Sequence, residues 1–381
     1  MPDFPDLVTP ATRATKPPPF ESLVARARVR RRTRVATTLT LVVVAVVAIA
    51  AGSALAGRHA TTRPITPPTP SPDARTAAIV RTGSLVSYAA APDGSVLTVW
   101  QRCARGDAHC AAAWRLTTRA GSWSGLAHGS EPFAYAAGNA FVVTSWDRLG
   151  DVVDNDGTAR PLRHVRSLVP ARGDVTVRSA KGLLLLDPRT AAVAELPLPP
   201  GADALAEATV DVDGTVYALP AFAGPGKVWV ARFRDRHWTH VVLSHGGARG
   251  TMPGYVVASG SHAAALSSFD GATILPVGVL GVTADGGDTW TMLTKSALPF
   301  GAVDSMAATS GGTLYLTTPD GEVYRSAEPN WTRFERVAAP RRTGELQGVG
   351  DQVVARIGTA KHPRLIVFDD SGWHPWPAAL R

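Results

Sequence analysis

The chain has 381 residues, of which 45% are hydrophobic and 18% are charged, so it can bury a sizeable core. Its formal net charge is +8, but the first 34 residues alone hold eight basic and three acidic side chains. The positive charge therefore belongs largely to the N-terminal end. This distribution argues against a nucleic-acid-binding protein, which needs a basic stripe on its folded domain.

The N-terminal end is expected to anchor the protein in a membrane. Residues 1–34 are polar, Pro-rich and basic, which predicts a disordered cytoplasmic tail. Residues 35–57 contain no charged side chain, and one transmembrane helix needs only about 20 apolar residues. Arginines precede this run and are sparse after it, so the N-terminus is predicted to be cytoplasmic and the rest extracytoplasmic. The alternative is a cleavable signal peptide, because Ala54-Leu55-Ala56 resembles a signal-peptidase site.

A linker is predicted between this span and the folded domain. Residues 58–76 hold prolines at positions 64, 67, 68, 70 and 72, and such a composition favours an extended spacer. At about 3.1 Å per residue, the spacer would hold the next domain on the order of 40 Å from the membrane.

Residues 77–381 change to short apolar strands that are separated by turn residues, with no amphipathic helix expected. Asp-Gly pairs, the strongest short hairpin signal, recur along the whole segment, for example at Asp93-Gly94, Asp213-Gly214 and Asp320-Gly321. Many short strands at regular spacing predict a sandwich, a barrel or a propeller. A repeat length near 40 residues favours the propeller, whose four-stranded blades bury both faces by stacking in a ring.

One stretch carries a specific motif. Thr283-Ala284-Asp285-Gly286-Gly287-Asp288-Thr289-Trp290 reads as a tight turn followed by an aromatic anchor. It resembles the Asp-box of the BNR repeat of sialidase-like β-propellers, and the fixed positions of that motif are matched by Thr283, Asp285, Gly287, Thr289 and Trp290. The resemblance implies an all-β propeller in which these five residues are structural. A weak calcium role for the Asp-rich turns is the alternative.

The number of blades follows from aligning the residue that should open each outermost strand. Seven positions recur at intervals of about 40 residues: Trp123, Leu162, Leu196, Trp238, Trp290, Trp331 and Trp373. Four of these tryptophans outside the motif, at positions 123, 238, 331 and 373, are predicted to be blade-end aromatics. The alignment predicts seven blades, with six as the alternative.

The two cysteines, Cys103 and Cys110, lie in a loop between two predicted strands of the first blade. The predicted extracytoplasmic location permits a disulfide, which would pin the base of this hairpin loop. A metal site with His109 is the alternative, but it lacks further ligands nearby. No other metal-ligand spacing and no cofactor motif is found in the sequence.

The family resemblance also implies sialidase activity, yet the family's catalytic set is not apparent. No Arg-Ile-Pro motif is present, and the six tyrosines form no evident Tyr/Glu constellation. We therefore expect a membrane-anchored, non-catalytic binding module that recognises an envelope glycan or protein and no nucleic acid. Two alternatives stay open: a transmembrane regulator linked to an extracytoplasmic sigma factor, and an envelope glycoside hydrolase with two facing carboxylates.

Overall fold

The computed structural model describes residues 72–103, 110–180, 182–221, 228–244, 251–269, 275–340, 342–378 and 380. These residues belong to one unit of the chain, Thr69–Arg381. The predicted cytoplasmic tail, the predicted span and most of the predicted linker lie outside the described residues. Within the described part, no helix has both the length and the apolar character that a membrane span requires.

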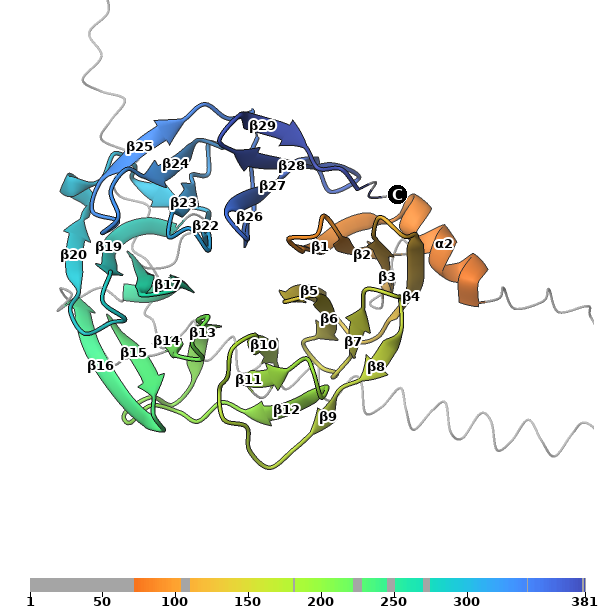
Figure 1. Ribbon diagram of the computed structural model, residues 1–381, viewed down its shortest axis with the longest axis horizontal. Helices are drawn as coiled ribbons and strands as arrows, with labels where there is room; N and C mark the ends of the chain where they lie inside the picture. Colours follow the sequence, from red (N-terminus) through yellow and green to blue (C-terminus); the bar gives the residue numbers. More distant parts are fainter. Residues whose placement is uncertain are drawn as a thin grey trace, which may run out of the picture. The chain divides into compact units, whose positions relative to one another are not determined.

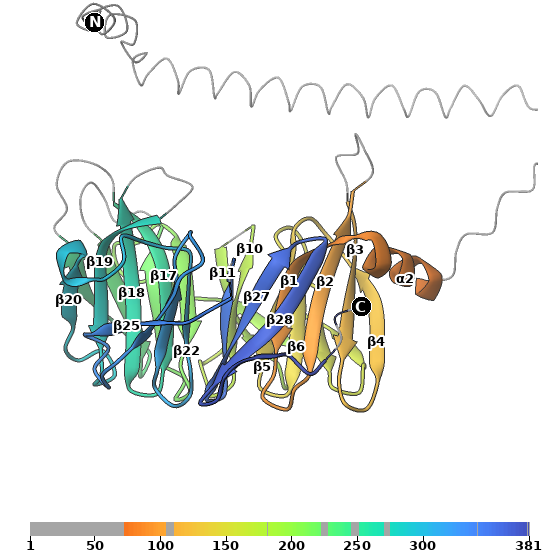
Figure 2. The ribbon, with the colours of Figure 1, turned by 90° about the horizontal axis from the view of Figure 1, so that it is seen from above.

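Seven sheets form a ring around a central axis, and their strands run along that axis (Figures 1 and 2). The strands of the first three sheets are β1 (Ser84–Ala90), β2 (Val96–Arg102), β3 (Ala111–Thr117) and β4 (Ser122–Ala127); β5 (Pro132–Ala137), β6 (Ala140–Ser145), β7 (Asp151–Asp154) and β8 (Ala159–Pro161); and β10 (Val175–Ser179), β11 (Gly182–Asp187), β12 (Ala192–Glu195) and β9 (Arg163–His164). Seven blades are thus confirmed, and the six-bladed alternative is wrong.

The remaining four sheets follow the chain in order. Their strands are β13 (Leu205–Val210), β14 (Val216–Pro220), β15 (Val228–Arg234) and β16 (His237–Ser244); β17 (Thr251–Ser259), β18 (His262–Phe269), β19 (Leu275–Thr283) and β20 (Thr291–Thr294), with β21 (Ala302–Val303) beside β19; β22 (Ser305–Ala308), β23 (Leu314–Thr317), β24 (Val323–Ser326) and β25 (Phe334–Val337); and β26 (Leu346–Val349), β27 (Gln352–Thr359), β28 (His362–Asp369) and β29 (Gly372–Pro375). A short 3-10 helix, η2 (Lys295–Ala297), follows β20.

The core lies between neighbouring sheets rather than in one central mass. In β11, Leu183 and Leu185 face the fourth sheet, whereas Leu184 and Leu186 face the second. Because successive side chains of a strand point to opposite faces, a strand buried on both faces needs a continuous apolar run. The four consecutive leucines of β11 are explained in this way.

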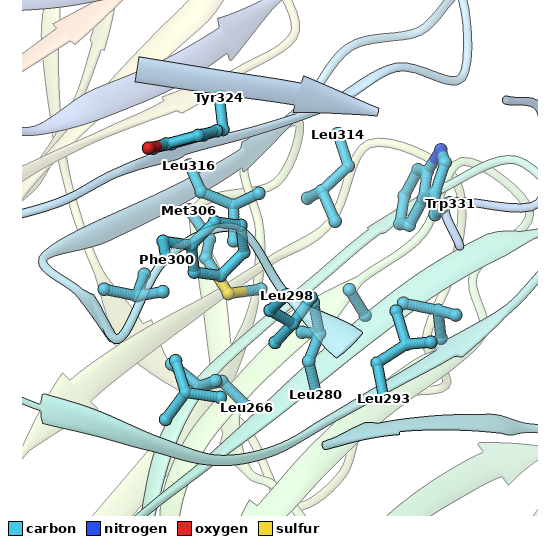
Figure 3. Close-up of a cluster of buried hydrophobic side chains, with 14 residues drawn as sticks. Leu266, Leu280, Leu293, Leu298, Phe300, Met306, Leu314, Leu316, Tyr324 and Trp331 are labelled. Carbon is cyan, nitrogen blue, oxygen red and sulfur yellow. The ribbon is translucent and has the colours of Figure 1, made fainter. Parts of the chain in front are cut away.

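The largest of these clusters fills the junction between the fifth and sixth sheets. Leu266, Leu280 and Leu293 of the fifth sheet meet Leu314 and Leu316 of the sixth, while Phe300 from the connecting segment packs among them (Figure 3). Trp331 closes the outer end of the cluster and is fully buried.

A helix precedes the first strand, although the sequence analysis expected none. Helix α2 (Pro72–Thr82) begins within the predicted linker and lies along the outer part of the first sheet (Figure 1). Its Ile79 and Val80 pack against Trp100 and Ala113 of the first sheet. Pro72 at the helix start and Asp73 in the first turn are favourable helix signals. The extended linker therefore cannot reach residue 76.

The third sheet departs from the pattern that the sequence predicted. Its outermost strand is β9, which precedes the rest of the sheet in the chain and pairs parallel with β12. Leu196 follows β12 and opens no outermost strand, whereas Leu162 follows β8 of the second sheet and directly precedes β9. Thr176 Oγ1 donates to Ala208 O (2.6 Å) and Arg178 Nη2 donates to Ala206 O (3.0 Å). These contacts show that inner strands β10 and β13 run in opposite directions.

The ring closes at a seam, the junction between the seventh and first sheets, without exchange of a strand. Hydrogen bonds cross the seam from Tyr88 Oη to Glu345 O (2.9 Å), from Ala90 N to Gln347 Oε1 (2.8 Å) and from Leu85 N to Ala360 O (2.8 Å). Apolar side chains of both sheets and Trp376 of the C-terminal segment complete the junction. Side-chain packing and isolated hydrogen bonds thus hold the first and seventh sheets together, because no strand joins them.

Candidate functional site

The motif residues of Thr283–Trp290 form the turn between β19 and β20 at the outer part of the fifth sheet. Asp285 is the hub of this turn. Its carboxylate accepts hydrogen bonds from Thr283 Oγ1 (2.7 Å), from the backbone N–H groups of Asp288 (3.0 Å) and Thr289 (2.9 Å), and from Thr289 Oγ1 (2.5 Å). The hydroxyl and amide of Thr289 hold the pKa of Asp285 well below its usual range.

The rest of the motif ties this turn to its surroundings. Gly287 has a φ of +87°, and Trp290 Nε1 donates to Gly287 O (3.2 Å). Arg232 of the fourth sheet donates to Gly286 O (2.6 Å) and pairs with Asp288 (2.6 Å). The hydrogen bonds of Asp285 and Trp290 thus hold the turn together, and Arg232 links the turn to the fourth sheet.

The predicted blade-end aromatics are spread around the rim. Trp123, Trp238 and Trp373 lie in the outermost strands β4, β16 and β29, and Trp331 precedes β25. Trp331 is fully buried, and its Nε1 donates to Gly312 O (2.7 Å). The structure therefore does not bring these four residues together in one site.

Polar side chains gather instead on the innermost strands and directly before them. Register contacts place one residue from each sheet at the same level of the axis. Tyr88 contacts Glu345, Tyr255 Oη donates to Asp304 O (2.5 Å), and Tyr135 accepts from the backbone N–H of Arg178, whose guanidinium pairs with Glu207. We call this set the belt, and its members are Tyr88, Tyr135, Arg178, Glu207, Tyr255, Asp304 and Glu345.

Two further hydrogen bonds fix the level of the belt. Ala134 N donates to Ser87 Oγ (3.0 Å), so Tyr135 follows Tyr88 around the ring. Leu346 N donates to Ser305 Oγ (3.0 Å), so Glu345 lies beside Asp304. The belt tyrosines bridge neighbouring sheets, whereas the charged members keep access to solvent.

The belt carries more negative than positive charge. Glu207 pairs with Arg178, but the nearest approach of Glu345 to Arg356 is 3.9 Å, at the limit of an ion pair. Asp304 is exposed and has no ion pair within the described part of the chain. A further cation would therefore find uncompensated carboxylate charge at this level.

Burial and neighbouring charges shift the pKa values of the belt carboxyl and tyrosine groups. Burial raises the pKa of Glu207, and the Arg178 guanidinium offsets part of that rise. Burial also raises the pKa of Glu345, with Arg356 opposing and Asp304 adding to the rise. Burial raises the pKa of Tyr135 to about 12. A bound cation would stabilise the ionised carboxylates and so reverse part of their shift.

The belt changes one expectation from the sequence, which showed no Tyr/Glu constellation. Tyr255 lies close enough to Glu207 and Glu345 for both to raise its pKa, after burial and Asp304. Its hydroxyl is occupied by the Asp304 carbonyl. The hydroxyl therefore donates to a backbone carbonyl rather than to either glutamate carboxylate.

The predicted disulfide is confirmed. Cys103 and Cys110 are bonded, with their Cα atoms 4.2 Å apart, and they join the ends of β2 and β3. Across the residues that the structure describes, no group of three or more His, Cys, Asp or Glu side chains could hold a metal ion.

The comparisons with known proteins concern the fold. No protein-family model and no curated protein matches this chain. The β-propeller domain of the Trilobed protease from Pyrococcus furiosus matches at 11% identity and a TM-score of 0.49, over 78% of this chain and 96% of that chain. A Mycobacterium tuberculosis puromycin-hydrolyzing peptidase matches at 13% identity and a TM-score of 0.46, over 79% of this chain, which spans about half (54%) of the peptidase.

A third solved structure is Chaetomium thermophilum Sqt1 bound to the N-terminus of the ribosomal protein L10. It matches at 13% identity and a TM-score of 0.46, over 76% of this chain and 86% of that chain. These likenesses carry no information on the ligand of this chain.

Proposed function

We propose that the protein is an extracytoplasmic binding module, tethered by a membrane span at residues 35–57, that receives a cationic group of a protein partner at the belt. The observation that carries this proposal is the surplus of carboxylates at one level of the inner strands, where Asp304 is exposed and Glu345 is weakly paired. Charge of one sign recognises a partner of the opposite sign.

The disulfide supports the proposed location. Disulfides persist in oxidising compartments outside the cytoplasm and are rare inside it, and Cys103–Cys110 is bonded. Protease added to spheroplasts should then degrade the propeller and spare a tag ahead of residue 1. Protection of the propeller until the membrane is permeabilised would contradict the proposed topology.

The belt can be tested with defined peptides. The full-length chain in detergent micelles should bind a fluorescent oligolysine peptide and should ignore an oligoglutamate peptide of equal length, as measured by anisotropy. The pair Asp304→Asn and Glu345→Gln should weaken binding by about tenfold for each charge removed. Affinity should also fall as pH falls, since Glu207 and Glu345 have raised pKa values and protonate first.

The matched control is Asp370→Asn, which removes an exposed carboxylate from the turn between β28 and β29. Equal losses in the control and the belt variant would mean that only net charge matters. If the chain co-sedimented with protein-free envelope polysaccharide and did not bind the peptide, the partner would be a glycan and not a protein. Release of soluble sugar in that assay would favour the hydrolase alternative.

A further inference from the structure

An exposed tryptophan lies at the same end of the ring as the belt. Trp146 directly follows β6 and is 45% exposed. Its backbone is held from both sides, because Trp146 N donates to Ser130 O (3.2 Å) and accepts at its own carbonyl from Ala180 N (2.5 Å). Ala180 comes only two residues after Arg178 of the belt. A fixed segment of backbone thus presents the indole to solvent beside the belt.

A second apolar side chain is exposed at this end of the ring. The register between β1 and β2 shifts between Leu85 and Ser87, which marks a β-bulge. Val86 has no partner in this ladder and is 37% exposed, whereas Leu85 and Ser87 are buried. A bulge turns a side chain away from the regular alternation of its strand. Tyr88 of the belt follows Val86 by two residues.

Both residues lie beside the start of β5. Ala134 N donates to Ser87 Oγ (3.0 Å), which places the bulge of β1 next to the second sheet. In that sheet, Trp146 follows the residue that pairs with Pro132, the first residue of β5. Strands β1, β5 and β10 are neighbours at the inner edge of the ring (Figure 1). We call Val86 and Trp146 the apolar pair, and its position next to the belt joins apolar surface to negative charge.

We infer that the protein partner carries a large apolar side chain close to its cationic group, and that this side chain packs on the apolar pair. The inference rests on the proposed function, because the belt sets the charge of the partner. Tryptophan is enriched among the few residues that carry most of the binding energy of an interface. Covering a half-exposed indole removes its remaining apolar surface from water. The recognised segment therefore combines lysine or arginine with leucine, methionine or an aromatic residue.

The test compares two fluorescent peptides on the full-length chain in detergent micelles. Each peptide has eight lysines around a central pair, which is Gly-Gly in one and Leu-Leu in the other, so their charges are equal. After binding to empty micelles is subtracted, anisotropy should show the Leu-Leu peptide bound about fivefold more tightly. Trp146→Ala should remove most of this difference and leave the affinity for the Gly-Gly peptide unchanged. Trp146→Phe should keep most of the difference, because phenylalanine retains an aromatic surface.

The matched control is Val169→Ala, which should change the affinity for neither peptide. Val169 is 60% exposed and lies with Asp213 and Gly214 beyond the end of β13, whereas Glu207 of the belt is near the start of that strand.

The outcomes separate this inference from the proposed function. If the Gly-Gly peptide bound and the Leu-Leu peptide bound no more tightly, the inference would fail and the proposed function would stand. Equal effects of Trp146→Ala and Val169→Ala would also overturn the inference. A loss of affinity for both peptides in Trp146→Ala would mean that the indole supports the belt and not an apolar contact. If neither peptide bound, the proposed function itself would fail.

Discussion

Replacing Trp331 with alanine is expected to lower the free energy of unfolding by about 4 kcal/mol, the largest effect of a single substitution that we predict. The side chain is fully buried at the junction of the fifth and sixth sheets, and its Nε1 donates to Gly312 O (2.7 Å). The His262 ring packs on it with centroids 5.2 Å apart. Alanine would leave a cavity and an unpaired carbonyl. Thermal unfolding by circular dichroism should show a midpoint lower by about 10 °C.

The control for this prediction is Trp331→Phe. Phenylalanine keeps much of the apolar volume and loses the hydrogen bond, so the loss should be about half as large. The φ of +60° at position 331 is shared by both variants and does not separate them. A loss below about 1 kcal/mol for alanine would contradict the packing role of this indole.

Acidification from pH 7.5 to pH 4.5 is expected to stabilise the propeller through Asp211. Burial raises the pKa of this carboxyl from 3.8 to about 6, against the effect of the Val212 and Gly260 backbone N–H groups. The folded state thus binds the proton more tightly than the unfolded state, and the penalty for ionisation grows as pH rises from about 4 to 6. At about 1.4 kcal/mol per unit, the penalty is about 3 kcal/mol.

Asp211→Asn should remove this part of the pH dependence, because asparagine keeps the acceptor for Gly260 N (2.8 Å) and Val212 N (2.6 Å) without the charge. Urea unfolding at the two pH values measures the difference directly. Asp320→Asn, in the exposed turn between β23 and β24, is the matched control and should leave the pH dependence as in the natural chain, whereas the charge of Asp213 adds to the rise of the Asp211 pKa. If the free energy of unfolding of Asp211→Asn changed with pH as much as that of the natural chain, Asp211 would not be the group responsible. Burial also raises the pKa of Asp174 to about 6. The free energy of unfolding of Asp211→Asn should therefore keep a pH dependence of similar size that is due to Asp174.

The architecture could be predicted from the sequence wherever a local rule applies. Asp-Gly turns and recurrent tryptophans mark the ends of hairpins and outer strands, and these positions predicted seven blades correctly. The third sheet escaped this reasoning because its outer strand, β9, comes from earlier in the chain and pairs parallel with β12. Such a pairing depends on a tertiary crossing that no local pattern records.

Helix α2 was missed for a different reason. Ala77-Ala78-Ile79-Val80 reads as the start of a strand when only its apolar side chains are considered. The structure places Ile79 and Val80 on a helix face that covers Trp100. Pro72 and Asp73 were the signals for the helix start, but their position in a Pro-rich segment favoured the linker interpretation.

The candidate site could not be predicted because its members are far apart in the chain. The belt runs from Tyr88 to Glu345, and its members lie on five inner strands and directly before two others, β22 and β26. The sequence drew attention to Asp285 and Trp290, whose contacts lie within the rim of the ring. A motif is visible when its residues are consecutive, whereas the belt exists only after seven separate strands have come together.

The seam also determines how the propeller would respond to a mechanical load. The chain enters the ring through helix α2 and strand β1, and it leaves through Trp376, so both ends of the fold lie at the same junction. Tension applied ahead of Pro72 would peel α2 from the first sheet and then pull on β1 from its edge. Since no chain segment connects the seventh sheet directly to the first, the ring would open at this junction first, and the other six junctions would carry little of the force.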